Sequence, residues 1–453
     1  MDFNKLLQEQ KDFFASNTTK AIDFRKKQLK KLKSILQKNE QKLYEAIHQD
    51  FGKSAFETYS TELSFVYTEI DFFLKNISSL SKPKRVSTNL ANQLGTSKIY
   101  SEPFGNILVI GAWNYPYQLS LLPAVCAIAT GNTVLLKPSE IAEHSAKAMA
   151  EMINTNFDCN YFHVVLGGVE ETTEILKLRF DKIFFTGSPK VGQIVYEAAA
   201  KHLTPVTLEL GGKSPAIVTK SADIGVTAKR IVWGKFLNAG QTCIAPDYAF
   251  VDESIKPFFL EKLKSEIEKS GYIKGSENYT FIINDRNFQR LKKLIIPEKV
   301  FYGGENDQEK RFIQPTILEN VNWEDAIMKE EIFGPILPVL TYKHFGAAID
   351  CIKQHEKPLS AYLFSKNEEE KKRFVNEISF GGGCINDTLM HISNPNLPFG
   401  GVGNSGIGSY HGAFGFETFS HRKAVLEKAN WGEPNLKYPP YTDTKKSIMK
   451  KVL

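Results

Sequence analysis

The first 80 residues alternate polar and charged stretches with apolar residues at three- and four-residue spacing, as in Leu29, Leu32 and Leu36. This spacing predicts amphipathic helices. The pattern breaks at 81–85, and the polar stretch 86–103, with its Ser, Thr and Gly, predicts a hairpin that stands apart from the core. We find no catalytic motif in the helical lead-in, and we expect the hairpin to make oligomer contacts.

From residue 106 onward, short apolar runs alternate with helical patterns. Runs that are apolar on both faces and separated by helices predict parallel strands in a doubly wound sheet, which is an α/β fold. The strands expected in this first sheet are 107–110, 133–136, 162–166, 183–185 and 206–208. The alternation resumes after Gly211 and predicts a second α/β domain, with strands at 216–218, 248–251, 336–340, 360–364 and 384–386.

The bulk composition fits a folded protein of several domains. At 453 residues the chain is too long for one ordinary core. Hydrophobic residues make up 42% and charged residues 24%, close to the globular average, which excludes disorder and a membrane protein. The longest apolar stretch, 119–131, contains Pro123 and is shorter than the roughly 20 residues of a spanning helix. The start of the chain has no apolar signal region, so we expect a cytoplasmic protein. We expect no nucleic acid partner.

Positive charge gathers near the two ends of the chain. The net charge is +6, and much of the excess lies in 25–33 and in the last ten residues. A solvated helix face explains each run, while the basic stretch 445–453 leaves open a weak attraction to anionic membrane surfaces. The tail beyond Trp431 contains three prolines and is expected to pack as an extended segment or to fray.

The five cysteines form neither a CxxC pair nor a Cys/His cluster at metal spacing. We therefore expect no disulfide and no metal site. Cys243 differs from the other four because Gly240, Gln241 and Thr242 precede it, and such residues make a poor core but a good tight turn. A thiol with a pKa of about 8.5 needs activation, which a helix N-terminus or a basic neighbour can supply. Cys243 is thus a candidate nucleophile, and its backbone N–H a candidate oxyanion donor.

Two further residues follow predicted strands. Glu209 ends the run 206–208 and precedes Leu210 and a pair of glycines, so its carboxylate could reach a cleft and activate water. Asn114 lies in Gly-Ala-Trp-Asn-Tyr-Pro-Tyr directly after the first strand. Its side-chain N–H₂ is a candidate donor to a developing oxyanion. Tyr115 is a candidate wall of the substrate pocket.

A third group of residues suits a dinucleotide. Lys137 and Glu140 end a strand with a cation and a carboxylate three residues apart, which suits ribose hydroxyls. Thr186, Gly187 and Ser188 follow another strand and open a helix whose N–H groups can face a pyrophosphate. The glycine spacing is a variant of the GxGxxG fingerprint and is a weak signal alone. Glu331 and Phe333 could hold a second ribose and its ring.

Together these strings resemble the aldehyde dehydrogenase superfamily. The similarity runs from Trp-Asn-Tyr-Pro at 113–116, through Leu-Glu-Leu-Gly-Gly-Lys at 208–213 and the string around Cys243, to Pro-Phe-Gly-Gly-Val-Gly-Asn-Ser-Gly at 398–406. The ending, with Phe-Glu-Thr-Phe-Ser-His-Arg at 416–422, is most similar to the class 3 branch, which acts on fatty and aromatic aldehydes.

The resemblance implies a Rossmann-like nucleotide domain (1–80 and 104–209), a catalytic α/β domain (210–410), and a small β bridging arm with a C-terminal tail (81–103 and 411–453). It also implies a homodimer that oxidises a small-molecule aldehyde to a carboxylic acid with NAD or NADP.

By the same resemblance, Cys243 is the nucleophile, Asn114 the oxyanion donor and Glu209 the general base. Lys137 and Glu140 match contacts to the adenine ribose, Glu331 and Phe333 match contacts at the nicotinamide end, and 186–188 line the dinucleotide cleft. Pro189 stands where the family often has threonine, and proline is well tolerated in a first helical turn.

Two alternatives remain at this stage. A catalytically silent binding protein on the same fold would be expected to lack the thiol, the base or the oxyanion donor, and all three are present. A thiol hydrolase would be expected to have a histidine base, and none of the nine histidines lies near either active-site string. The choice between NAD and NADP, and the length of the aldehyde, stay open.

Overall fold

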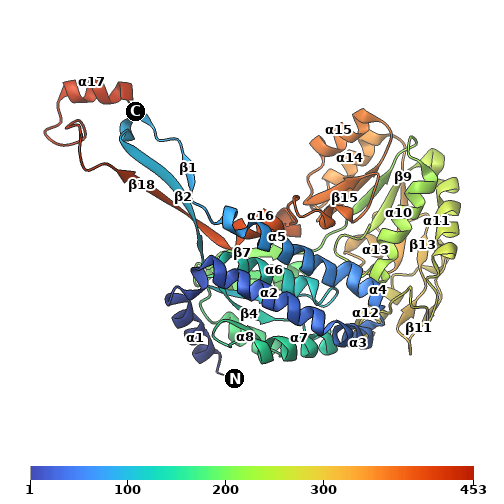
Figure 1. Cartoon of the computed structure of the whole chain (residues 1–453). Helices are drawn as coiled ribbons and strands as arrows, with labels where there is room; N and C mark the ends of the chain where they lie inside the picture. Colours follow the sequence, from blue (N-terminus) through green and yellow to red (C-terminus); the bar gives the residue numbers. More distant parts are fainter. Residues whose placement is uncertain (1, 453) are drawn as a thin grey trace.

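The computed structural model describes residues 2–452, which form a body built on two sheets and a projecting arm (Figure 1). The helical lead-in is confirmed. Its helices are α1 (Phe3–Ala15), α2 (Ile22–Lys38), α3 (Glu40–Phe51), α4 (Ala55–Thr58) and α5 (Ser64–Leu80), with a π-helical turn, η2 (Tyr59–Leu63), between the last two.

The first sheet has six strands in the order β17-β7-β6-β3-β4-β5, and all except β17 are parallel. The strands are β3 (Asn106–Ile110), β4 (Thr133–Lys137), β5 (Phe162–Val164), β6 (Lys182–Thr186), β7 (Val206–Glu209) and β17 (Gly406–Ile407). The helices between them are α6 (Gln118–Thr130), α7 (Glu143–Asn156), α8 (Val169–Leu176) and α9 (Pro189–Ala200). The five strands predicted here are confirmed, with ends shifted by two residues at most. Pro189 indeed opens its helix.

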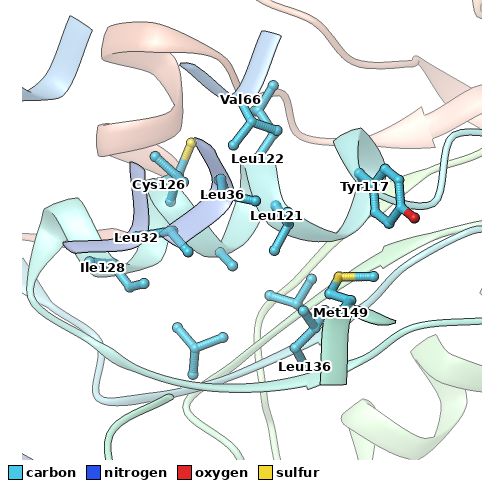
Figure 2. Close-up of a cluster of buried hydrophobic side chains, with 14 of the residues drawn as sticks. Leu32, Leu36, Val66, Tyr117, Leu121, Leu122, Cys126, Ile128, Leu136 and Met149 are labelled. Atoms are coloured by element: carbon cyan, nitrogen blue, oxygen red, sulfur yellow. The ribbon is translucent and has the colours of Figure 1, made fainter. Parts of the chain in front are cut away.

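Both faces of this sheet are covered, which explains the apolar strands. In β3, Ile107 and Val109 belong to one buried cluster, while Leu108 and Ile110 belong to another on the opposite face. Helix α6 is buried at every position, so the longest apolar run of the chain is a core helix. Figure 2 shows its residues Leu121 and Leu122 among side chains from neighbouring elements.

The second sheet has seven strands in the order β10-β13-β14-β9-β8-β15-β16, of which only β10 is antiparallel to its neighbour. Its strands are β8 (Pro215–Val218), β9 (Tyr248–Asp252), β10 (Val300–Tyr302), β13 (Thr316–Leu318), β14 (Ile336–Tyr342), β15 (Ser360–Phe364) and β16 (Gly382–Ile385). Its helices are α10 (Ile224–Phe236), α11 (Lys256–Ser270), α12 (Asp285–Lys292), α13 (Ala326–Lys329), α14 (Phe345–Lys353) and α15 (Glu368–Glu377), and β11 (Asn306–Asp307) and β12 (Phe312–Ile313) form a separate small ladder. All five predicted strands are present, and β10 and β13 are additional.

The arm is a three-stranded antiparallel sheet rather than a two-stranded hairpin. The short β1 (Lys84–Val86) and the long β2 (Gly95–Pro103) pair as expected, and β18 (Ser420–Lys428) adds along the whole length of β2. Helix α16 (Gly412–Thr418), which precedes β18, packs on α5 and α6 in the body. The tail differs from the expected extended segment, because α17 (Asp443–Val452) forms near the tip of the arm (Figure 1). Asp443 in its first turn and lysines in its last turn complement the helix dipole.

No helix within residues 2–452 is long and apolar enough to cross a membrane.

Candidate active site

The predicted site residues of the first sheet lie at one edge of it. Asn114 follows β3, and Lys137, Thr186 and Glu209 are the last residues of β4, β6 and β7. The register pairs Ile110 with Lys137 and Thr186 with Glu209, so these carboxyl ends are level. The strand order reverses between β3 and β6, and ligands of doubly wound sheets bind outside the strand ends at such a point.

Cys243 lies on the turn that leads from α10 to β9. The turn is tight because three successive residues, Asn238, Ala239 and Gly240, have left-handed backbones with φ of 53°, 50° and 72°. A Cβ atom at position 240 would lie 2.3 Å from the Gly334 carbonyl oxygen, so this position requires glycine. The small residues before Cys243 therefore form the turn that the sequence predicted.

Side-chain hydrogen bonds join the loop after β3 to the Cys243 turn. The Asn114 Nδ2 atom donates to the Gln241 carbonyl oxygen over 3.0 Å. The Tyr115 hydroxyl and the Thr242 Oγ1 atom lie 2.6 Å apart. An amide has two N–H donors, so one N–H of Asn114 is not used by the bond to Gln241. The structure thus brings together Asn114, Tyr115 and Cys243, which are far apart in the sequence.

Three residues of this region, Tyr115, Thr242 and Cys243, line a cavity of about 850 Å³. Tyr115, the residue proposed from the sequence as a wall of the substrate pocket, is thus one of the lining residues. About half of the remaining lining residues are apolar, and the others are polar, such as Gln118. The apolar ones include Phe65, Leu119, Leu122, Trp233, Ile392 and Phe399. Such a cavity suits a small molecule with a substantial apolar part.

Burial and neighbouring carboxylates disfavour ionisation of the Cys243 thiol. Burial, and then the carboxylates of Glu331 and Glu209, raise its pKa, while backbone N–H groups of Cys243 and Ile244 act in the opposite direction. The sequence suggested that a basic neighbour could activate this thiol. Among the described residues, no basic side chain lowers its pKa, because the charged side chains that shift it, Glu331 and Glu209, are acidic.

Glu209 is buried at the end of β7 with a relative exposure of 2%. Neither carboxylate oxygen has a hydrogen-bond partner among residues 2–452. Burial therefore raises the pKa of Glu209 well above its usual range. A carboxyl group that the fold leaves without partners is free to bind water or a proton.

Glu331 and Phe333 approach the site from the second sheet. Burial, followed by Asp247, raises the pKa of Glu331 to about 8, and the Gly212 backbone acts against this shift. A Cβ atom at Gly211 would lie 2.0 Å from Glu331 Oε2, so this carboxylate fits there because position 211 has no side chain. Phe333 has a φ of 49°, and its ring centroid is 5.3 Å from that of Trp113, next to Asn114.

The remaining predicted residues form a polar site along the same edge. Lys137 is buried, and its ammonium donates to the Pro138 carbonyl oxygen (2.7 Å) and to Glu140 Oε2 (3.3 Å). Thr186 Oγ1 is buried and has no partner within the described chain. The next two residues lead to α9, where Pro189 has no N–H and the Val191 N–H donates to Ser188 Oγ, so the N–H of Lys190 is the first-turn donor left for a ligand. An unpaired hydroxyl beside a helix N-terminus fits the phosphates of a dinucleotide.

Four buried polar residues behind the site were not found from the sequence. Lys53, Glu57 and Glu62 come from the helical lead-in, and Asn238 comes from the Cys243 turn. One signal was present, because Glu62 lies four residues before Val66, on the apolar side of the helical pattern. A charged residue on that side is a candidate for a buried ion pair.

Comparison with known proteins agrees with this geometry. The aldehyde dehydrogenase family matches residues 1–425. The chain is 46% identical to the 4,4'-diaponeurosporen-aldehyde dehydrogenase of Staphylococcus aureus, over 96% of the chain and 95% of that protein. It is 48% identical to the dimeric NADP-preferring aldehyde dehydrogenase of Rattus norvegicus, over 95% of the chain and 96% of the relative.

The fold agrees as well. The structure of the substrate-bound state of Staphylococcus aureus AldH superposes with a TM-score of 0.97 at 45% identity, covering 100% of this chain and 99% of that one. The expected fold, with two α/β units and a β arm, is confirmed. The family predicted from the motifs is also confirmed: this chain belongs to the aldehyde dehydrogenase family.

Proposed function

We propose that this protein oxidises apolar aldehydes to carboxylic acids with NAD or NADP, through a thioester on Cys243. One observation carries the proposal most directly: the 3.0 Å hydrogen bond from Asn114 to the Gln241 carbonyl oxygen ties an amide donor to the turn that carries Cys243, and Cys243 lines the cavity. The family match and the two relatives named as aldehyde dehydrogenases support the reaction class.

In the first half of the cycle, the Cys243 thiol loses its proton to water, and the resulting thiolate attacks the aldehyde carbon to give a tetrahedral thiohemiacetal oxyanion. The oxyanion accepts hydrogen bonds from the free N–H of Asn114 and from the backbone N–H of Cys243. The bound dinucleotide supplies the hydride acceptor. Loss of hydride from the former aldehyde carbon leaves a thioester on Cys243.

In the second half, Glu209 removes a proton from a water molecule that attacks the thioester carbon. Collapse of the resulting intermediate releases the carboxylic acid and the Cys243 thiolate. A buried carboxyl with a raised pKa is a stronger base than an exposed glutamate once it has ionised.

The dinucleotide would lie along the edge of the first sheet. Lys137 and Glu140 would hold the adenine ribose, 186–188 would line the phosphate site, and Glu331 and Phe333 would hold the nicotinamide end. We assign 1–80 and 104–209 to the nucleotide domain, 210–410 to the catalytic domain, and 81–103 and 411–453 to the arm and tail. The long, exposed edge strand β18 and the word dimeric in one relative's name support a homodimer formed through the arm.

The first experiment follows the formation of reduced nicotinamide with NAD and with NADP against short aliphatic, long aliphatic and aromatic aldehydes. Cys243→Ala should abolish it, because the nucleophile is lost. Cys351→Ala, which removes another half-buried thiol, is the matched control and should retain activity. If the unaltered protein reduces neither dinucleotide with any of these aldehydes, the proposed function is wrong.

The role of Glu209 is tested by separating the two half-reactions. Glu209→Gln should keep a stoichiometric burst of reduced nicotinamide, while the steady-state rate falls by about 10² or more because the base is lost. Rapid-mixing absorbance measures both phases in one trace. A Gln variant that turns over at the unaltered rate would contradict the assignment.

The pH dependence of deacylation follows from the pKa of Glu209. A protonated carboxyl cannot act as a base, so hydrolysis of the acyl-enzyme should slow as the pH falls through the raised pKa of this group. The inflection should lie well above the usual range for glutamate and should be absent in Glu209→Gln. Deacylation rates measured across the neutral range test this, and an inflection at the ordinary glutamate value would refute it.

The cavity predicts a preference for longer apolar aldehydes. Each buried methylene contributes about 0.8 kcal/mol, so kcat/KM should rise about fourfold per added CH₂ until the cavity is filled. A homologous series of straight-chain aldehydes measures the slope, and aldehydes of equal length that end in a carboxylate serve as controls. Equal kcat/KM values along the series would show that this cavity does not bind the chain.

A further inference from the structure

A fully buried ion pair of the helical lead-in contacts the main chain of the candidate oxyanion donor, Asn114. Lys53 is between α3 and α4, and Glu62 is in η2; both side chains have 0% exposure. The ammonium of Lys53 donates to Glu62 Oε1 over 2.8 Å. Burying two charges is unfavourable unless their hydrogen-bonding capacity is used, so their other partners matter.

Those partners are the backbone of the loop that carries Asn114. Lys53 Nζ also donates to the Asn114 carbonyl oxygen (3.3 Å) and lies 4.2 Å from the centroid of the Tyr115 ring. Glu62 Oε2 accepts from the backbone N–H groups of Tyr117 (2.8 Å) and Gln118 (3.4 Å), where α6 begins. The two charges therefore hold both ends of the segment 114–118.

The same carbonyl links this segment to the Cys243 turn. Asn238 Nδ2 donates to the Asn114 carbonyl oxygen over 2.9 Å and to the Gln241 carbonyl oxygen over 3.2 Å. The backbone N–H of Asn238 donates to Glu57 Oε1 over 3.0 Å, so a second buried carboxyl from the lead-in holds the turn. The Asn114 side chain then closes the ring of contacts through Gln241.

We propose that Lys53 and Glu62 are positioning residues for the oxyanion donor: they fix the main chain of Asn114, and so aim its free N–H at the developing negative charge. This inference rests on the proposed function. Neither residue touches the reacting atoms. A displacement of about 1 Å in an active site can cost on the order of 10² in rate, which is the size of effect expected when this support is removed.

A double-mutant cycle tests the proposal. Replacing the pair by neutral side chains of similar shape, Lys53→Met with Glu62→Gln, should lower the burst rate constant about 10- to 100-fold with little change in KM. In an Asn114→Ala background the same two substitutions should lower it by less than about twofold, because the donor they position is already gone. Lys299→Met with Asp325→Asn removes a partly buried pair in the second sheet's domain and is the matched control.

Two results would overturn the proposal: an equal loss of burst rate in both backgrounds, which is the signature of a general structural role, or no loss in either. If the double replacement does not fold, as judged by circular dichroism, Glu62→Gln alone is used in the same cycle and decides in the same way. Activity of the unaltered protein is measured alongside, so that absence of any aldehyde oxidation counts against the proposed function and not against the positioning role.

Discussion

The active site depends on one constraint: every polar group withdrawn from water in the loop after β3 has to find a partner inside the protein. Asn114 meets this requirement twice, since its carbonyl oxygen accepts from Lys53 and Asn238 and its side chain donates to Gln241. Each partner belongs to a different part of the chain. Because an unpaired buried polar group costs about 1–3 kcal/mol, the alternatives to this arrangement are unfavourable, and the thiol and the amide stay together.

Much of the fold could be predicted because its strands are buried on both faces. Strands such as β3 and β4 are short, fully buried runs with apolar centres between helices, and local pattern is sufficient to find them. The elements that were missed are of another kind. Strands β10 and β13 lie at and next to an edge of the second sheet, and β18 exists because it pairs with β2, which is more than 300 positions away in the sequence. Pairing over such distances leaves no local signal.

The residues of the candidate site likewise fall into those that the sequence predicts and those that it does not. Cys243, Glu209 and Asn114 stand in distinctive strings at strand ends and turns, where the sequence itself marks a special backbone. Lys53 and Glu62 stand in an ordinary helical pattern, where a charged residue is most often on the surface. Their burial follows only from the packing of the lead-in against α6. Resemblance to a family pointed to the proposed reacting groups, and three-dimensional contacts were needed to find the residues that hold them.

The charges of the site also suit the order of the proposed steps. Burial raises the pKa of both Cys243 and Glu209, and the carboxylate of Glu209 raises that of the thiol further. Burial and mutual repulsion therefore disfavour negative charges on both groups at the same time. In the proposed cycle, the thiolate is consumed when the thioester forms, and only afterwards does Glu209 need to ionise to activate water. Mutual repulsion would oppose a mechanism that needs both charges together, and it does not oppose one that uses them in turn.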